Sequence, residues 1–113
     1  MIGRTAVVLA AALALLALAA CGGPRPVVDG VELRPPQQDG QPYLLVVTLR
    51  NASGGQGQVT VSARITGANG QVAASEEQHT ASLSPHEVER LTIDVQPAAP
   101  GPYTVEVKAS YPP

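Results

Sequence analysis

From residue 27 onward, hydrophobic and polar residues follow a period of two, with no helical spacing over any useful length. Residues 43–51 place Tyr43, Leu45 and Val47 at alternate positions, and residues 59–66 alternate almost without interruption. A period of two puts successive side chains on opposite faces of a strand. The pattern therefore predicts strands at residues 27–34, 43–51, 59–66, 71–77, 88–95 and 103–109.

Glycine and proline separate these strands. Asp29-Gly30 is expected to break the first strand, and Pro35-Pro36 ends it. Asn69-Gly70 can adopt the positive φ of a tight turn, and residues 97–102 contain three prolines that exclude a central strand. The strand at 71–77 carries Glu76-Glu77, and charge of this kind opposes edge-to-edge pairing, so we place it at a sheet edge. Short strands punctuated in this way indicate an all-β domain, a small antiparallel two-sheet sandwich of six or seven strands.

The first twenty residues have a different pattern. Arg4 precedes an uncharged stretch of mostly Ala, Leu and Val at residues 6–18. Its length suits the hydrophobic segment of a helical secretion signal, but it is too short to span a hydrocarbon core of about 30 Å, which takes about 20 residues. The stretch ends in small residues followed by a cysteine, in the order Leu18-Ala19-Ala20-Cys21. Residues 1–20 are therefore expected to be a signal peptide that is removed.

The motif Leu18-Ala19-Ala20-Cys21 resembles the lipobox of bacterial lipoproteins. The resemblance implies cleavage between Ala20 and Cys21 and a diacylglyceryl thioether on Cys21, often with a further acyl chain, such as palmitate, on the new amino terminus. The lipid bilayer would then be a partner of the chain. Because Gly22 rather than Asp follows the cysteine, the resemblance favours the outer membrane where the organism has one. Residues 21–26 would form a flexible tether.

Residues 27–111 resemble the immunoglobulin-like or fibronectin type III-like domains of bacterial surface proteins. The resemblance rests on order: a strand, an Asn/Gly-rich loop at 51–57, Leu-x-Pro-x-Glu at 83–87, and Pro-Gly-Pro-Tyr at 100–103 opening the last strand. Such domains normally add one more strand. Either residues 80–83 supply a short one, or one sheet has an open edge that could accept a partner strand. Tyr103 is expected to form a tyrosine corner, with its hydroxyl bonded to backbone and its ring packed inward.

Charge and cysteine content narrow the function classes. The chain has seven basic and nine acidic residues, and removing residues 1–20 takes away only Arg4 among them. This mild acidity, without a basic patch, argues against nucleic acid as a partner. Cys21 is the only cysteine, so no internal disulfide can form.

Candidate chemistry outside Cys21 is sparse. His79 and His86 are the only histidines, with Glu76, Glu77 and Glu87 near them in sequence. They are the only candidates for a metal site, but their spacing matches no metal-binding signature, and two solvated polar loops explain it better. No nucleophilic triad can be proposed from the spacing, and no cofactor is expected.

A glycosylation sequon is present at Asn51-Ala52-Ser53, but a loop or turn explains these residues better in a bacterial lipoprotein. The sequence as a whole predicts a membrane-anchored envelope module without enzymatic activity. It would bind a protein or polysaccharide, or act structurally, through its sheet faces or the loops at 35–42, 51–58 and 96–102. The alternative is an inhibitor or accessory subunit of an envelope enzyme or secretion complex, with a metal-binding periplasmic protein less favoured.

Overall fold

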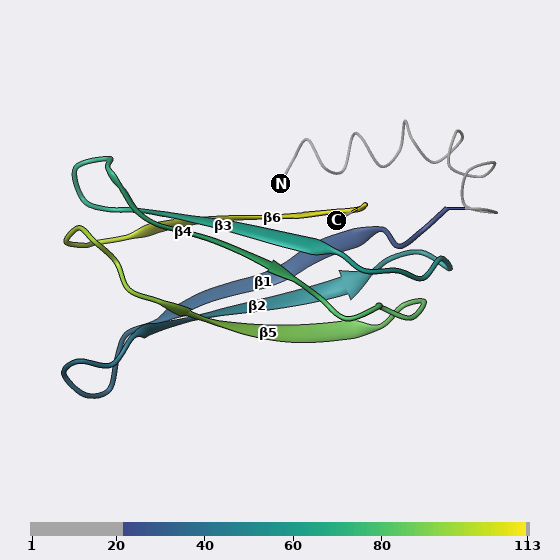
Figure 1. The fold of residues 1–113 in the computed structure, drawn as a ribbon, viewed down its shortest axis with the longest axis horizontal. Helices are drawn as coiled ribbons and strands as arrows, with labels where there is room; N and C mark the ends of the chain where they lie inside the picture. The colour runs from purple at the N-terminus through teal and green to yellow at the C-terminus, as the bar shows by residue number, and fades with distance from the viewer. Residues whose placement is uncertain (1–21, 113) are drawn as a thin grey trace.

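The computed structural model describes residues 22–112, which form six strands and no helix (Figure 1). Cys21, the cleavage position and the expected signal helix lie outside the described residues. The strands, in chain order, are β1 (Pro26–Arg34), β2 (Tyr43–Asn51), β3 (Thr60–Thr66), β4 (Val72–His79), β5 (Val88–Val95) and β6 (Thr104–Ser110).

The strands form two antiparallel sheets with the orders β1-β2-β5 and β4-β3-β6 (Figure 1). This confirms the all-β, two-sheet sandwich expected from the alternation, and it places β4 at an edge, as Glu76-Glu77 indicated. Residues 80–83 do not supply a further strand. They contribute a single bridge, between Gly57 and Leu83.

Strand bounds follow the pattern closely where both flanking turns are clear. Strands β2 and β5 have the predicted bounds, whereas β4 extends to His79, two residues beyond expectation. The first strand also differs, because Asp29-Gly30 does not break it. The register shifts between Val28 and Gly30, so the extra residue is absorbed as a bulge and pairing with β2 continues to Arg34.

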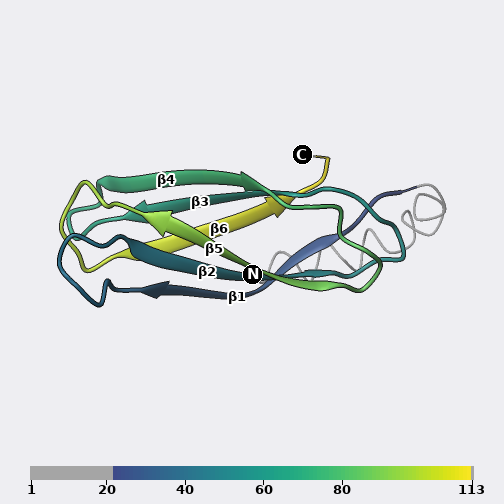
Figure 2. The ribbon, with the colours of Figure 1, turned by 60° about the horizontal axis from the view of Figure 1, so that its bottom comes forward.

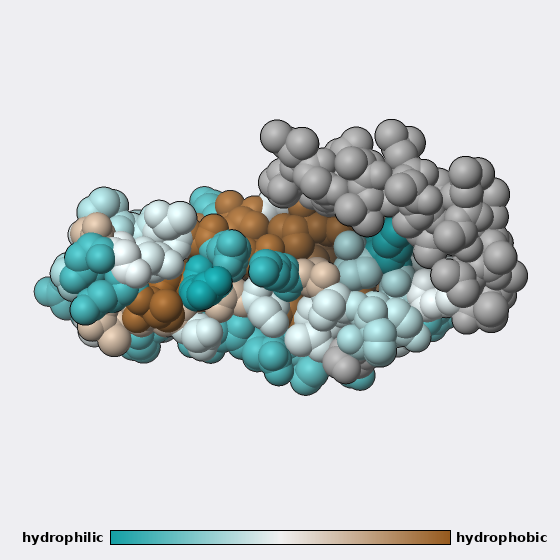
Figure 3. Space-filling model, turned by 90° about the horizontal axis from the view of Figure 1, so that it is seen from above, coloured by the Kyte–Doolittle hydropathy of each residue, from teal (hydrophilic) through white to brown (hydrophobic). Residues whose placement is uncertain are grey.

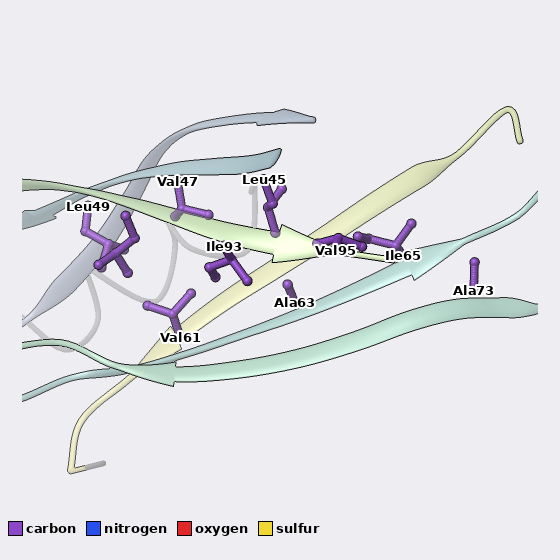
Figure 4. Packing of buried hydrophobic residues seen from close by; sticks show 10 residues of the cluster. Leu45, Val47, Leu49, Val61, Ala63, Ile65, Ala73, Ile93 and Val95 are labelled. Carbon is purple, nitrogen blue, oxygen red and sulfur yellow. The ribbon is translucent and has the colours of Figure 1, made fainter. Parts of the chain in front are cut away.

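The core lies between the sheets and consists of aliphatic side chains (Figure 4). Alternate residues of β2, β3 and β5 point into it, as their period of two requires. Burying each Val, Leu or Ile side chain there contributes about 1.5–3 kcal/mol before the loss of entropy is counted. The buried members are Leu45, Val47, Leu49, Val61, Ala63, Ile65, Ala73, Leu91, Ile93 and Val95.

The molecule is long and narrow, about 50 × 26 × 18 Å, and its two ends are built from different loops (Figure 2). Because every pairing is antiparallel, the start of β1 and the end of β6 lie at the same end. We call this the N-terminal end; it also contains the loops 52–59 and 80–87. The opposite, far end contains the loops 35–42, 67–71 and 96–103.

Candidate functional site

The N-terminal end is organised around one buried amide, that of Asn51. This side chain, the last of β2, is fully buried. Its Nδ2 donates to the carbonyl oxygens of Gly55 at 2.8 Å and Ser84 at 3.0 Å, and its Oδ1 accepts from the backbone N–H of Arg25 at 3.0 Å. The Ser53 hydroxyl also donates to Oδ1, at 3.1 Å. One side chain therefore joins three separate segments, and its nitrogen is enclosed rather than presented for glycosylation.

Residues 22–25, which follow Cys21 directly, contact the domain. Pro24 is buried, and its ring lies so close to Gly57 that a Cβ added there would be 2.8 Å from the Pro24 Cδ. Gly55 has no room for a Cβ against the carbonyl oxygens of Gly22 and Gly23. Glycine at position 55 therefore permits a close backbone approach. Residues 22–25 belong to the segment expected to be a flexible tether, and they pack against the loop 52–59.

The two histidines do not converge with the acidic residues near them. The Nδ1 of His79, at the end of β4, lies 2.9 Å from the Thr60 hydroxyl oxygen. His86 has a φ of 61° in the turn at 84–87, where the Ser84 N–H donates to the Glu87 carboxylate at 2.7 Å. Among residues 22–112, no three His, Cys, Asp or Glu side chains form a group that could hold a metal ion.

Tyr103, immediately before β6, connects two elements at the far end. Its hydroxyl donates to the Ala99 carbonyl oxygen at 2.7 Å, and its ring meets that of Tyr43 edge to face, with centroids 5.4 Å apart. Burial raises the pKa of the Tyr103 hydroxyl, and Tyr43 adds to the shift. A hydroxyl bonded to backbone four residues upstream, with the ring packed inward, is the geometry of a tyrosine corner.

The carboxylate of Glu89 lies on the side of its sheet that faces the core. Glu89 on β5 is opposite Leu49, whose side chain is fully buried, so Glu89 shares the inward face of the sheet. Its Oε2 is buried without a hydrogen-bond partner. Burial raises the pKa of this carboxyl, and the neighbouring charge of Glu87 raises it further. Glu89 is two residues before Leu91 and four before Ile93, so the period of two in β5 is the sequence signal that it faces inward.

The outer face of β4-β3-β6 carries a shallow polar hollow. Arg64 and Glu106 form an exposed ion pair across it, with Arg64 Nη2 3.1 Å from Glu106 Oε1. This pairing lowers the pKa of the Glu106 carboxyl, with further contributions from the charges of Lys108 and Arg64. The hollow can offer hydrogen bonds and charges of both signs to a polar partner. It is lined by Ser62, Ala63, Arg64, Ser75, Glu76, Glu77, Glu106 and Lys108.

Comparison with known proteins yields no family. No family model matches the chain, and no curated protein matches it. A β-glucosidase from Streptomyces venezuelae, solved in complex with D-glucose, is similar over 65% of this chain and 10% of its own, with 16% sequence identity and a TM-score of 0.48. The described part of the chain contains no helix long and apolar enough to cross a membrane.

Proposed function

We propose that this chain is a bacterial envelope lipoprotein, anchored through lipid on Cys21, whose sandwich domain binds or spaces other envelope components without enzymatic activity. The observation that carries the proposal is the motif Leu18-Ala19-Ala20-Cys21 directly before a folded domain. Two or more acyl chains anchor a protein stably, at about 0.8 kcal/mol for each buried methylene, whereas one chain does not.

The contacts of residues 22–25 support a close attachment. Pro24 is buried and Arg25 is bonded to Asn51, so little free chain separates position 21 from the domain. A lipid on Cys21 would hold the N-terminal end of the sandwich near the bilayer. A partner would then meet the sheet faces or the far-end loops, 35–42, 67–71 and 96–103.

The non-enzymatic part of the proposal rests on the distribution of perturbed groups. Catalytic groups usually show shifted pKa values and gather in a cleft. Among residues 22–112, the groups with shifted pKa values are Arg50, Glu89, Tyr103 and Glu106, which lie on different elements, and each shift has a structural cause. Arg50, for example, forms an exposed ion pair with Asp29 on one sheet. Glu106 forms an exposed ion pair with Arg64 on the other sheet.

The anchor is tested by Cys21→Ala in the full chain. We expect the original chain to partition with membranes and to carry a diacylglyceryl-modified N-terminal Cys21, visible in the mass of its first peptide. The variant should lose the modification and the normal cleavage. Ser53→Ala, which leaves the motif intact, is the control. A Cys21→Ala chain that is still cleaved normally and still sediments with membranes would refute the lipid anchor.

The partner is sought by capturing the lipidated protein from its native membrane, with Cys21→Ala as the control. Envelope proteins or polysaccharide recovered only with the anchored chain would support the proposal. Stoichiometric recovery of a single envelope enzyme, whose activity changes on binding, would instead favour an accessory subunit or inhibitor.

A further inference from the structure

The sandwich has four edge strands, and three of them carry devices that oppose pairing with another chain. Strand β1 has the bulge at Asp29. Strand β4 has a register shift near Val72, and its Glu76 is opposite the core residue Ala63, so it points inward. Strand β5 has the inward Glu89. Bulges and inward charges are the usual protection of natural edges.

Strand β6 has none of these devices. It pairs with β3 in continuous register, and it contains no proline. Its inward residues, Val105, Val107 and Ala109, are apolar but only partly buried. The charges on its outward face are one of each sign, Glu106 and Lys108. This edge is therefore the least protected of the four.

An apolar groove runs beside this edge, between β6 and β1. Its lining includes Val28, Val31, Val105 and Val107. Val31 is opposite Val47, a fully buried residue, so it lies on the inward face of its sheet, yet 43% of it is exposed. Figure 3 views the molecule from above Figure 1, the side on which β6 lies. On this side, hydrophobic residues gather near the middle of the described surface. The edge of β6 is thus bordered by an apolar groove rather than covered by another strand of its own sheet.

We propose that β6 pairs with β6 of a second copy of this chain, in antiparallel register about Val107. The sequence of β6, TVEVKAS, is self-complementary in that register. Val107 faces Val107 of the second copy, and Val105 faces its Ala109, so the apolar side chains remain on the face of the groove. Glu106 faces Lys108 of the second copy, and Lys108 faces its Glu106. The contact is isologous and closes at two copies.

Charge also selects this register over its neighbours. Opposite residues share a face, so registers that keep the valines inward differ by steps of two residues. A shift of the second copy by two residues in one direction places Glu106 opposite Glu106 of that copy. A shift by two residues in the other direction places Lys108 opposite its Lys108. Opposite charges across strands stabilise pairing and like charges oppose it. In the favoured register, Glu106 lies between Arg64 of its own chain, 3.1 Å away, and Lys108 of the second copy.

Strand β5 is the rival edge, because Arg90 and Asp94 on its outward face could also pair with a second copy. Its inward face argues against this. In the register that pairs Arg90 with Asp94, Glu89 would face Val95 of the second copy and lose its remaining access to water. Strand β6 presents no such charge, so the two edges can be separated by experiment.

The test uses two differently tagged full-length chains expressed together, with capture through one tag and measurement of the other. For the original chain we expect co-capture. Glu106→Lys or Lys108→Glu in both copies should lower it about ten-fold, because each change places two like-charge pairs across the two-fold axis. Mixing a Glu106→Lys chain with a Lys108→Glu chain should restore co-capture, because each pair of residues 106 and 108 across the two β6 strands is then again of opposite sign.

The mixed pair also separates self-pairing from a folding defect, since misfolded chains would not recover when combined. Arg90→Asp is the matched control on β5 and should leave co-capture unchanged. The proposal is overturned if the original chains are not co-captured, if the mixed pair does not recover, or if Arg90→Asp abolishes co-capture while Glu106→Lys does not. A distinct protein held by β6, with no second copy, would also overturn it.

Discussion

Asn51 bonds to three segments that are distant from one another in the sequence, and its side chain is fully buried. A buried amide is tolerated only when its donors and acceptors are all used. Here the amide is also the link between residues 22–25 and the rest of the domain. The stability of the N-terminal end, and the placement of any anchor beside it, therefore depend on a single polar side chain.

We predict that Asn51→Ala lowers the free energy of unfolding by about 2–4 kcal/mol, because several buried backbone groups lose their partners and each such group costs about 1–3 kcal/mol. Urea denaturation of the two proteins measures the difference. Ser53→Ala, which removes one hydroxyl from the same network, should cost less than half as much. Equal effects of the two changes would show that Asn51 is not the centre of the network.

The inward carboxylate of Glu89 predicts a pH effect of a specific sign. Its folded-state pKa is raised by burial, so the ionised form destabilises the fold at neutral pH. As pH falls through that raised pKa toward the unfolded value, the folded state binds the proton first and stability increases. We expect Glu89→Gln to be more stable than the original at neutral pH. The difference should shrink as pH falls through this window.

Thermal unfolding at several pH values, comparing Glu89→Gln with the original chain, measures this difference. Glu32→Gln, at an exposed position on β1, is the control and should show no comparable trend. A Glu89→Gln protein whose stability relative to the original is the same at every pH would contradict the assignment of a raised pKa to Glu89.

At the scale of elements, Tyr103 determines how β6 enters the sheet. Its hydroxyl fixes the loop 96–103 while its ring packs on Tyr43. We predict that Tyr103→Phe lowers stability by about 0.5–1.5 kcal/mol, because one hydrogen bond is lost and the ring remains. Tyr111→Phe, outside the strands, is the matched control. Amide exchange should accelerate first in residues 98–105; an effect confined to other regions would contradict this role.

The strands could be predicted from sequence because their information is local. Alternation in 43–51 and 88–95, bounded by proline and polar turns, gave the bounds of β2 and β5. The bulge at Asp29 was not predictable, since a bulge depends on the partner strand. The network around Asn51 was missed for the same reason, because it joins residues up to 33 positions apart. The groove beside β6 could not be predicted either, because it depends on which strands lie at the sheet edges and which strand of the other sheet lies beside them.

At the scale of the whole molecule, both proposals depend on the same long shape, about 50 Å from end to end. A single anchored copy would have its far end, including Asp39, well away from the bilayer. We predict that energy transfer from a dye at position 39 to acceptors in the membrane is weaker for Glu106→Lys than for the otherwise unchanged chain. Equal transfer in the two proteins would show that β6 has no influence on orientation.

The reason lies in the direction of β6, which runs toward the N-terminal end. Two copies joined by antiparallel β6 strands point in opposite directions, so their lipidated cysteines would emerge at opposite ends of the pair. Such a pair cannot stand upright with both lipids in one bilayer. It would lie with its long axis parallel to the membrane and a lipid anchor at each end. The broad faces of its sheets, rather than its far-end loops, would then face the aqueous compartment.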